Sequence, residues 1–305
     1  MNSSEPGQDT QHHRAGLALG LAAYALWGVL PIYFKLIEEL PAVDIVAHRI
    51  LWSLPFLAAL ILISRGWSKV REVLARRRTV ALLAVTALLI GGNWLLYVQA
   101  VTSGHILAAS FGYYLNPLAN VLLGRFVLGE RLTRLQWIAV AIAAVGISVL
   151  AAGALSQLWI SLTLCVTFAL YGLLRKVIAA DAVTGLAIET AILFPAAIAW
   201  LLWRSSNGAP FMGQSHFLAA LLLAAGVVST TPLLLFIAAA RRLPYSTLGM
   251  LQFLAPTLQF AIAVGLYDEP FTTAHAIAFP AIWIALGLYV TALVRHARAD
   301  VTPPE

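Results

Sequence analysis

Charged side chains are scarce in this sequence. Only 10% of its 305 residues are Asp, Glu, Lys or Arg, while 61% are hydrophobic. Soluble domains average about a quarter charged and about half apolar residues. The mean hydropathy of +0.87 agrees with this contrast. The composition therefore excludes an ordinary water-soluble domain and indicates a chain that lies mainly in a lipid bilayer.

The sequence also lacks the common chemical motifs. Its one cysteine, Cys165, can form no intrachain disulfide. HExxH, GxSxG, GxxxxGK[ST] and Cys/His clusters are all missing, so nothing indicates a metal or serine hydrolase or a phosphate-loop ATPase. The net charge of +6 comes from short basic clusters between apolar runs, which is not the pattern of a nucleic-acid-binding surface. We expect no enzyme activity, cofactor, metal or nucleic-acid partner.

What the sequence does contain is a series of apolar runs, each long enough to span a bilayer as a helix of about 20 residues. The first 15 residues are polar, and the run after them contains Pro31 and Lys35, which favours a first span over a cleaved signal peptide. We predict an all-α integral membrane protein with ten transmembrane helices. The predicted spans are 16–36, 43–64, 79–102, 105–126, 135–153, 157–174, 183–203, 217–240, 246–267 and 273–294.

The distribution of basic residues predicts the orientation. With the N-terminus in the cytoplasm, all 19 Lys and Arg residues fall on the inner side except Lys35, Arg49 and Arg204. Cytoplasmic connections carry the excess of Lys and Arg in membrane proteins. We expect a multi-pass protein of the bacterial inner membrane with both termini, residues 1–15 and 295–305, in the cytoplasm.

The chain contains an internal repeat. A shift of 139 residues places Pro117 on Pro256 and Glu130 on Glu269, and a shift of 144 places the stretch 25–28 on 169–172. The expected repeats are residues 16–153 and 157–294. Because each contains five spans, the second must enter the membrane from the opposite side. Inverted repeats of this kind are typical of secondary transporters.

Several motifs along the chain resemble the EamA-type drug/metabolite transporters, and most closely their RarD branch. They are ASFGYYLNP at 109–117, LGERL at 128–132, LQW at 135–137, YGLLRK at 171–176, TPLL at 231–234 and STLG at 246–249. The resemblance covers residues 15 to 295 and implies a ten-helix fold that exports amphipathic metabolites or drugs; the RarD name is linked with chloramphenicol. One departure is Asp268-Glu269-Pro270, which stands where the first half has Gly129-Glu130-Arg131.

Aromatic and neutral polar residues recur on one side of several predicted spans. Such stripes either bond helices together or line a cavity for a neutral or zwitterionic solute, and the sequence leaves both readings open. A polyanionic substrate would need more basic groups within the spans. The predicted substrate-binding residues are Trp27, Asn93, Tyr97, Tyr113, Tyr114, Asn116 and Gln252.

Three of the ionisable residues within predicted spans, Arg49, His48 and Glu189, form a candidate gating or charge network. Arg49 could reach outward to Asp44, pair with another span or bind a substrate carboxylate. His48 is four residues after Asp44 and could contact it. Glu189 could pair with Arg175, Lys176 or Arg49, or carry a proton, which makes the proton a candidate coupling ion.

Two prolines occupy matching places in the repeats. Pro117 and Pro256 each remove a backbone hydrogen bond within a span, so they predict kinks that either move during transport or are static. Taken together, these features indicate a secondary transporter that exports small molecules by alternating access. The alternative is a channel or flippase-like protein.

Overall fold

The computed structural model describes residues 6–102, 106–151, 158–266 and 273–299. All secondary structure in these ranges is helical, which confirms the predicted all-α class. The helices are α1 (Pro6–Lys35), α2 (Ala42–Ile63), α3 (Trp67–Ala75), α4 (Arg77–Thr102), α5 (Ile106–Phe126), α6 (Arg134–Ala151), α7 (Leu158–Val177), α8 (Ala182–Ser206), α9 (His216–Ala240), α10 (Tyr245–Leu251), α11 (Leu254–Leu266) and α12 (Thr273–Ala299).

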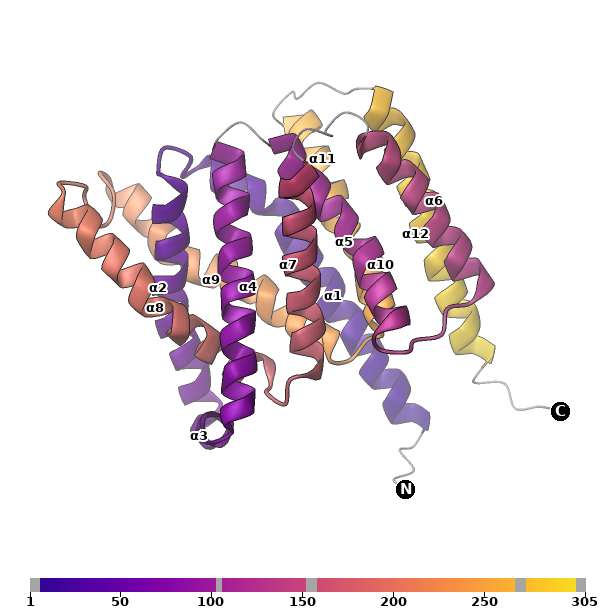
Figure 1. The fold of residues 1–305 in the computed structure, drawn as a ribbon, viewed down its shortest axis with the longest axis horizontal. Coiled ribbons are helices and arrows are strands. Elements are labelled where there is room, and N and C mark those ends of the chain that lie inside the picture. Colours follow the sequence, from indigo (N-terminus) through magenta and orange to yellow (C-terminus); the bar gives the residue numbers. More distant parts are fainter. Residues whose placement is uncertain (1–5, 103–105, 152–157, 267–272, 300–305) are drawn as a thin grey trace.

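The long helices lie side by side in one bundle (Figure 1). Helices α2, α8 and α9 pack at one edge of the bundle, and α6 pairs with α12 at the other. Within the described ranges, six helices are long and apolar enough to cross a membrane: α1, α2, α4, α7, α8 and α9. The chain is thus a multi-pass membrane protein.

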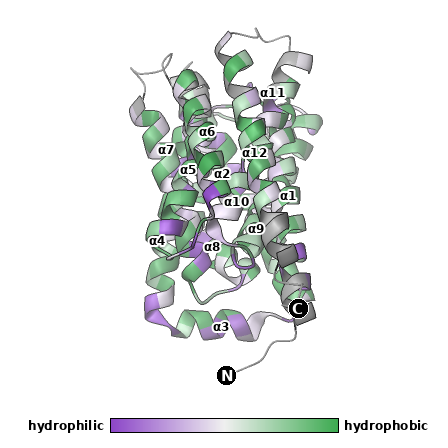
Figure 2. Ribbon diagram, turned by 90° about the vertical axis from the view of Figure 1, so that its right-hand side faces the viewer, coloured by the Kyte–Doolittle hydropathy of each residue, from purple (hydrophilic) through white to green (hydrophobic). Residues whose placement is uncertain are grey.

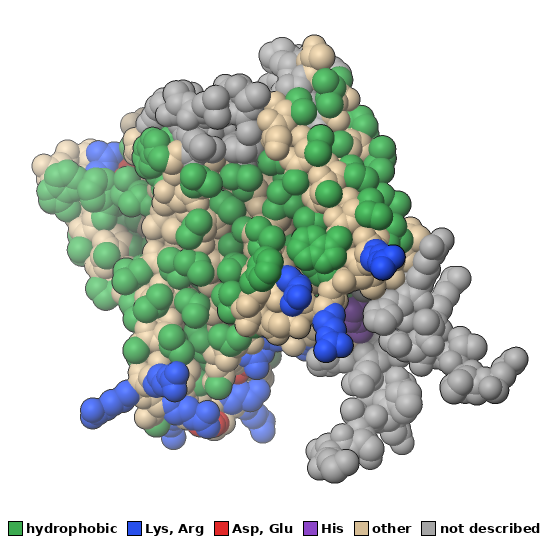
Figure 3. Space-filling model, turned by 45° about the vertical axis from the view of Figure 1, so that its right-hand side comes forward, with side chains coloured by type: hydrophobic (Ala, Val, Ile, Leu, Met, Phe, Trp, Pro, Cys, Tyr) green, Lys and Arg blue, Asp and Glu red, His purple; other side chains and the backbone are tan. Residues whose placement is uncertain are grey.

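The outer surface of the bundle is apolar. Large hydrophobic side chains remain exposed on several helices, for example Ile63, Phe126 and Val145, which are 80%, 73% and 65% exposed. In Figure 3, hydrophobic side chains cover the middle of the visible face, whereas Lys and Arg gather mainly toward its lower end. An apolar surface of this extent suits contact with lipid rather than water.

Helix α3 was not predicted. It is nine residues long and lies across one end of the bundle, roughly perpendicular to the long helices (Figure 2). Its apolar residues Trp67, Val70 and Leu74 recur at helical spacing between basic residues, and Trp67 and Leu74 are about half exposed. A helix this short, with charged residues between its apolar ones, gives no hydropathy signal of a membrane span. We call this side of the bundle the α3 end.

Two further boundaries differ from the sequence prediction. Helix α1 begins at Pro6, within the predicted tail 1–15, because residues 8–15 contain no helix-breaking residue. The predicted span 246–267 is divided into α10 and α11 at Gln252 and Phe253. The division places Pro256 in the first turn of α11, where a missing N–H leaves no intrahelical hydrogen bond unmade. Pro117, by contrast, lies inside the continuous helix α5.

Charged side chains form hydrogen bonds with the connections between helices at the α3 end. Glu130, which follows α5, accepts hydrogen bonds from the backbone N–H groups of Tyr245 (2.5 Å) and Ser246 (3.0 Å) and from the Ser246 hydroxyl (2.6 Å). Lys176 donates to the carbonyls of Ala240 and Leu243. These contacts satisfy backbone groups that helix ends leave unpaired.

Asp181 caps the start of α8. Its carboxylate accepts hydrogen bonds from the Thr184 backbone N–H (3.0 Å) and from the Thr184 hydroxyl (2.8 Å). Partial burial of the carboxyl opposes its ionisation, but the bonds from Thr184 and the charge of Lys69 outweigh burial and hold the pKa of Asp181 below its usual range.

Replacing Asp181 by Ala should therefore lower the free energy of unfolding by about 1 kcal/mol. Because the folded-state pKa is depressed, the contribution is fully present above the unfolded pKa of about 3.9 and is lost as pH falls through the folded value. Thermal unfolding in detergent at neutral and at acidic pH measures both effects. Asp181→Asn should retain most of the capping and lose the pH dependence; an equal loss at all pH values in Asp181→Ala would contradict the assignment.

Candidate substrate cavity

A cavity of about 90 Å³ lies between helices from both halves of the chain. A cavity needs about 10–15 Å³ to hold one buried water, so this space is several times larger than a single water requires. Seven of the fourteen lining residues are aromatic. The lining residues are Tyr24, Trp27, Leu30, Pro31, Phe34, Arg49, Trp94, Tyr97, Tyr113, Phe168, Gln252, Ala255, Pro256 and Gln259.

The cavity occupies the half of the bundle that is farther from the α3 end. Arg49 is in the second turn of α2, and Trp94 and Tyr97 are in the last turns of α4, so both helices contribute their ends opposite α3. Toward the α3 end, the space between the helices is filled by a buried cluster that includes Tyr171, Phe236 and Tyr245. The cavity is therefore closed on that side.

Rings packed edge to face build the wall. Trp27 meets Phe168 at 5.8 Å between centroids, and Tyr97 meets Tyr113 at 5.2 Å, both in T-shaped arrangements. Tyr24 also lines the cavity, and its hydroxyl donates a hydrogen bond to the Leu248 carbonyl of α10 (3.1 Å). Contacts of this geometry fix the ring orientations and so shape the cavity.

The structure brings four of the seven predicted substrate-binding residues to this cavity: Trp27, Tyr97, Tyr113 and Gln252. Asn93 lies beside it. Its amide nitrogen donates to the Leu164 carbonyl (2.9 Å) and the Thr167 hydroxyl (2.8 Å), and its oxygen accepts from the Tyr113 hydroxyl (3.3 Å). Asn93 thus joins α4 to α7 and positions Tyr113.

The other two predicted residues lie elsewhere. Tyr114 packs in a cluster with Phe253 and Tyr289, on the side of α5 that faces α6 and α12. Asn116 is fully buried, and its side-chain nitrogen and oxygen have no hydrogen-bond partner within the described part of the chain. Neither residue lines the cavity.

Gln252 sits where α10 ends. Its side-chain oxygen accepts a hydrogen bond from the Asn120 amide of α5 (3.0 Å), which leaves the Gln252 amide nitrogen as a donor at the cavity. The two helices approach closely here, because a Cβ atom at Gly249 would lie 2.9 Å from the Pro117 carbonyl oxygen. Pro117 therefore contacts α10, whereas Pro256 lines the cavity itself.

Arg49 is the basic residue of the cavity lining. It is 4% exposed, its Nε donates to the Ser229 hydroxyl (2.7 Å), and its guanidinium carbon lies 4.2 Å from the centroid of the Trp94 ring and 5.7 Å from that of Phe34. Within the described residues no ion pair joins Arg49 to a carboxylate. Of the expected alternatives, neither Asp44 nor Glu189 is its partner.

Burying the charge of Arg49 without an ion pair has a free-energy cost. Burying an unpaired charge costs several kcal/mol. A cation–π contact returns about 2 kcal/mol when desolvated, and one hydrogen bond to a charged group returns about 1.5–3 kcal/mol. The contacts of Arg49 with Trp94 and Ser229 are of the same order as this cost, but they supply no negative charge, so an added anion would find the guanidinium charge unpaired.

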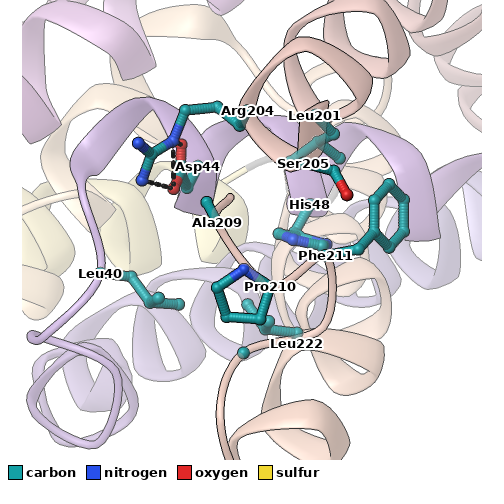
Figure 4. Close-up of a pocket in the computed structure, with 11 residues that line it drawn as sticks. Leu40, Asp44, His48, Leu201, Arg204, Ser205, Ala209, Pro210, Phe211 and Leu222 are labelled. Carbon is teal, nitrogen blue, oxygen red and sulfur yellow. Dashed lines mark hydrogen bonds and ion pairs between the residues drawn. The ribbon is translucent and has the colours of Figure 1, made fainter. Parts of the chain in front are cut away.

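Asp44 is engaged away from the cavity. Its carboxylate accepts hydrogen bonds from the Arg204 guanidinium (3.0 Å) and the Trp200 indole N–H (2.9 Å). Figure 4 shows this pair beside His48, whose ring lies against Phe211 at 5.7 Å and 76°. These residues line a pocket of about 20 Å³, which is enough for about one water. His48 and Asp44 line the same small pocket without a hydrogen bond between them.

Glu189 forms the second buried carboxylate site. It lies 3.5 Å from Arg175, and the two side chains are 1% and 0% exposed. The Thr86 hydroxyl (2.5 Å) and the Tyr171 hydroxyl (3.4 Å) donate to its two oxygens. Of the three expected partners of Glu189, which were Arg175, Lys176 and Arg49, it is Arg175 that forms the ion pair. The network joins α4, α7 and α8 at the α3 end.

Sequence reasoning did not single out Phe34, Trp94 or Phe168 as cavity residues. The repeat carried a signal for one of them, because the 144-residue shift that aligns Trp27 with Tyr171 also aligns Tyr24 with Phe168. Phe34 and Trp94 carry no comparable signal. Their place follows from how α1, α2 and α4 pack around Arg49.

Comparison with known proteins agrees with this architecture. Residues 14–152 match the EamA-like transporter family. Protein RarD of Salmonella typhi is 46% identical over 92% of this chain and 96% of its own, and an uncharacterized transporter of Vibrio cholerae is 46% identical over 92% and 93%. A solved crystal structure with 17% identity superposes with a TM-score of 0.70 over 92% of this chain and 98% of its own, so the fold is shared. The chain therefore belongs to the EamA-like transporter family and, within it, to the branch of the RarD proteins.

Proposed function

We propose that the protein is a secondary carrier that exports small amphipathic solutes across the bacterial inner membrane by alternating access. The observation that carries the proposal is the aromatic cavity, which is built by helices of both halves and closed toward the α3 end. Trp27, Tyr97, Tyr113 and Gln252 contact the solute, together with Phe34, Trp94 and Phe168. Asn93 positions Tyr113.

The carrier consists of two inverted repeats, residues 16–153 and 157–294. In addition to the six long, apolar helices named above, we propose that α5, α6, α12 and the pair α10–α11 cross the membrane, which gives ten spans. The packing supports this division, because α1 packs on α9 and α11 as α7 packs on α4 and α5, and α2 packs on α9 as α8 packs on α4. An odd number of spans in each half makes the repeats antiparallel.

We propose that the α3 end is cytoplasmic, as are the tails 1–15 and 295–305. The cavity then faces the periplasm in this conformation, and export requires a second conformation that opens between α7, α9 and α10. A proton is the candidate coupling ion. The function is transport and not catalysis, and an imposed pH gradient that leaves the rate unchanged would remove the proton from the scheme.

The orientation predicts which introduced cysteines react. Ser206 and Ser68 are both exposed, at opposite ends of the bundle, whereas Cys165 is buried. A membrane-impermeant maleimide added to intact cells should label Ser206→Cys and leave Ser68→Cys unlabelled. Both should react once the cells are permeabilised. Labelling of Ser68→Cys alone in intact cells would invert the orientation.

Transport itself is tested in two steps. Comparing the metabolites retained and released by cells that lack or overproduce the protein identifies candidate solutes. Proteoliposomes then distinguish a carrier from a channel or flippase-like protein. A carrier gives a rate that saturates with solute concentration and rises when the vesicles are preloaded with unlabelled solute. A rate that stays proportional to concentration, with no effect of preloading, would favour the channel.

A further inference from the structure

The buried charges of the bundle do not balance within the described residues. Two carboxylates there are buried, and each has its own arginine: Asp44 pairs with Arg204 and Glu189 with Arg175. Arg49 is equally buried and makes no ion pair in the same ranges. The positive charge that remains therefore sits at the wall of the cavity.

Arg49 and Gln252 leave hydrogen-bond donors at this wall, and Gln259, whose amide nitrogen donates to the Trp27 carbonyl (3.0 Å), leaves its side-chain oxygen there as an acceptor. Arg49 uses Nε for Ser229, and its two terminal nitrogens make no hydrogen bond within the described part of the chain. The Gln252 amide nitrogen is also left as a donor, because its oxygen is taken by Asn120. No carboxylate lines the cavity among the described residues. An anionic group satisfies such a donor set, whereas an ammonium group finds no opposite charge there.

From this charge balance and donor set we infer that the cavity takes a monocarboxylate: a solute with one carboxylate, held by Arg49, on an aromatic or aliphatic body that carries no ammonium group. The inference rests on the proposed function and names its substrate class. One guanidinium neutralises one charge, so a dianion is disfavoured. The body of the solute packs between Trp27, Phe168 and Tyr113, and the planar guanidinium can receive both carboxylate oxygens.

Matched acids and amides test the charge assignment. The probes are benzoate, octanoate and indole-3-propionate, each with its primary amide, and tryptophan as the analogue of indole-3-propionate that carries an ammonium group. Binding to the purified full chain in detergent is measured by calorimetry at neutral pH. At least one acid should bind about tenfold or more tightly than its amide, since a charge-assisted bond replaces a neutral one. Indole-3-propionate should bind more tightly than tryptophan.

Variants separate the role of Arg49 from general effects. Arg49→Gln should abolish the preference for acid over amide, and Arg49→Lys should keep part of it. Lys35→Gln removes a positive charge from the exposed surface pair with Glu38 and should leave the preference intact. Without ligand, Arg49→Met should not lower the unfolding temperature, because it removes a buried charge that has no carboxylate partner.

Two binding results for the wild type would overturn the inference: no acid binds at millimolar concentration, or the amides or tryptophan bind as tightly as the acids. Two results for the variants would also overturn it: Arg49→Gln keeps the preference for acid over amide, or Arg49→Met unfolds at a temperature well below that of the wild type. The last result would make Arg49 a structural residue. If amides bind as tightly as acids and Trp27→Ala weakens both, the cavity remains the substrate site and only the carboxylate assignment fails. If Trp27→Ala leaves transport unchanged, the proposed site fails as well.

Discussion

Replacing Arg175 by Met should lower the free energy of unfolding by about 3–5 kcal/mol, because it leaves the buried Glu189 carboxylate without its positive partner. Both side chains are almost completely buried, and Thr86 and Tyr171 already donate to the carboxylate, so no water can take the place of the guanidinium without rearrangement. Arg175 also donates weakly to the Asp181 carbonyl at the start of α8 (3.3 Å). Reversible unfolding in mixed detergent measures the loss.

The Asp44–Arg204 pair is the matched control for this variant. It is a similar ion pair, but the Arg204 side chain is 34% exposed, so Arg204→Met should cost about 1 kcal/mol or less. Replacing both Arg175 and Glu189 by apolar residues should recover much of the loss seen with Arg175→Met alone. If Arg175→Met and Arg204→Met cost the same, Glu189 is not held as a charge by Arg175.

Replacing Trp27 by Ala should weaken solute binding or transport by more than tenfold. The Trp27 ring lines the cavity and packs on Phe168, Phe236 and Tyr24, and a buried aromatic contact is worth about 2 kcal/mol or more. Half-saturation in counterflow and the initial rate of uptake measure the effect. Insertion should survive, because Trp27 is a small part of the apolar surface of α1.

The control for Trp27 is another tryptophan. Trp159 is 61% exposed on the outer face of α7, so Trp159→Ala should leave binding and rate close to the wild type. Tyr114→Phe should also transport normally, since Tyr114 faces the cluster around Phe253 and not the cavity. A Trp27→Ala protein that matches Trp159→Ala in rate and half-saturation would place the solute elsewhere.

Hydropathy alone predicted the helical class and the position of the long helices, because lipid demands apolar segments whose backbone groups bond within the segment. It could not predict α3, which is only nine residues long and has charged residues between its apolar ones. Nor could it predict the division of the span 246–267, because the residues around Gln252 are as apolar as their neighbours. Close to this division, Gly249 lies in close contact with α5, a tertiary contact that hydropathy does not report.

The sequence predicted only part of the candidate site. Tyr113 and Tyr114 are adjacent, and adjacent residues on a helix point about 100° apart, so one stripe could not contain both. The structure turns Tyr113 toward the cavity and Tyr114 toward α6 and α12. The sequence identified Arg49 as a charge within a span, but its contacts with Ser229 and Trp94 arise from three different helices. No spacing along one helix encodes them.

In the proposed carrier of two repeats, the break between α10 and α11 makes the repeats unequal, because the matching helix α5 is continuous through Pro117. If the halves were identical, exchanging their conformations would give inward- and outward-open states of equal free energy. With one half broken, the two states differ in free energy and the resting population shifts to one of them. Without a driving ion, the half-saturation concentration and the maximal rate of transport then differ between the two faces of the membrane. Microscopic reversibility requires that the maximal rate divided by the half-saturation concentration is the same in both directions.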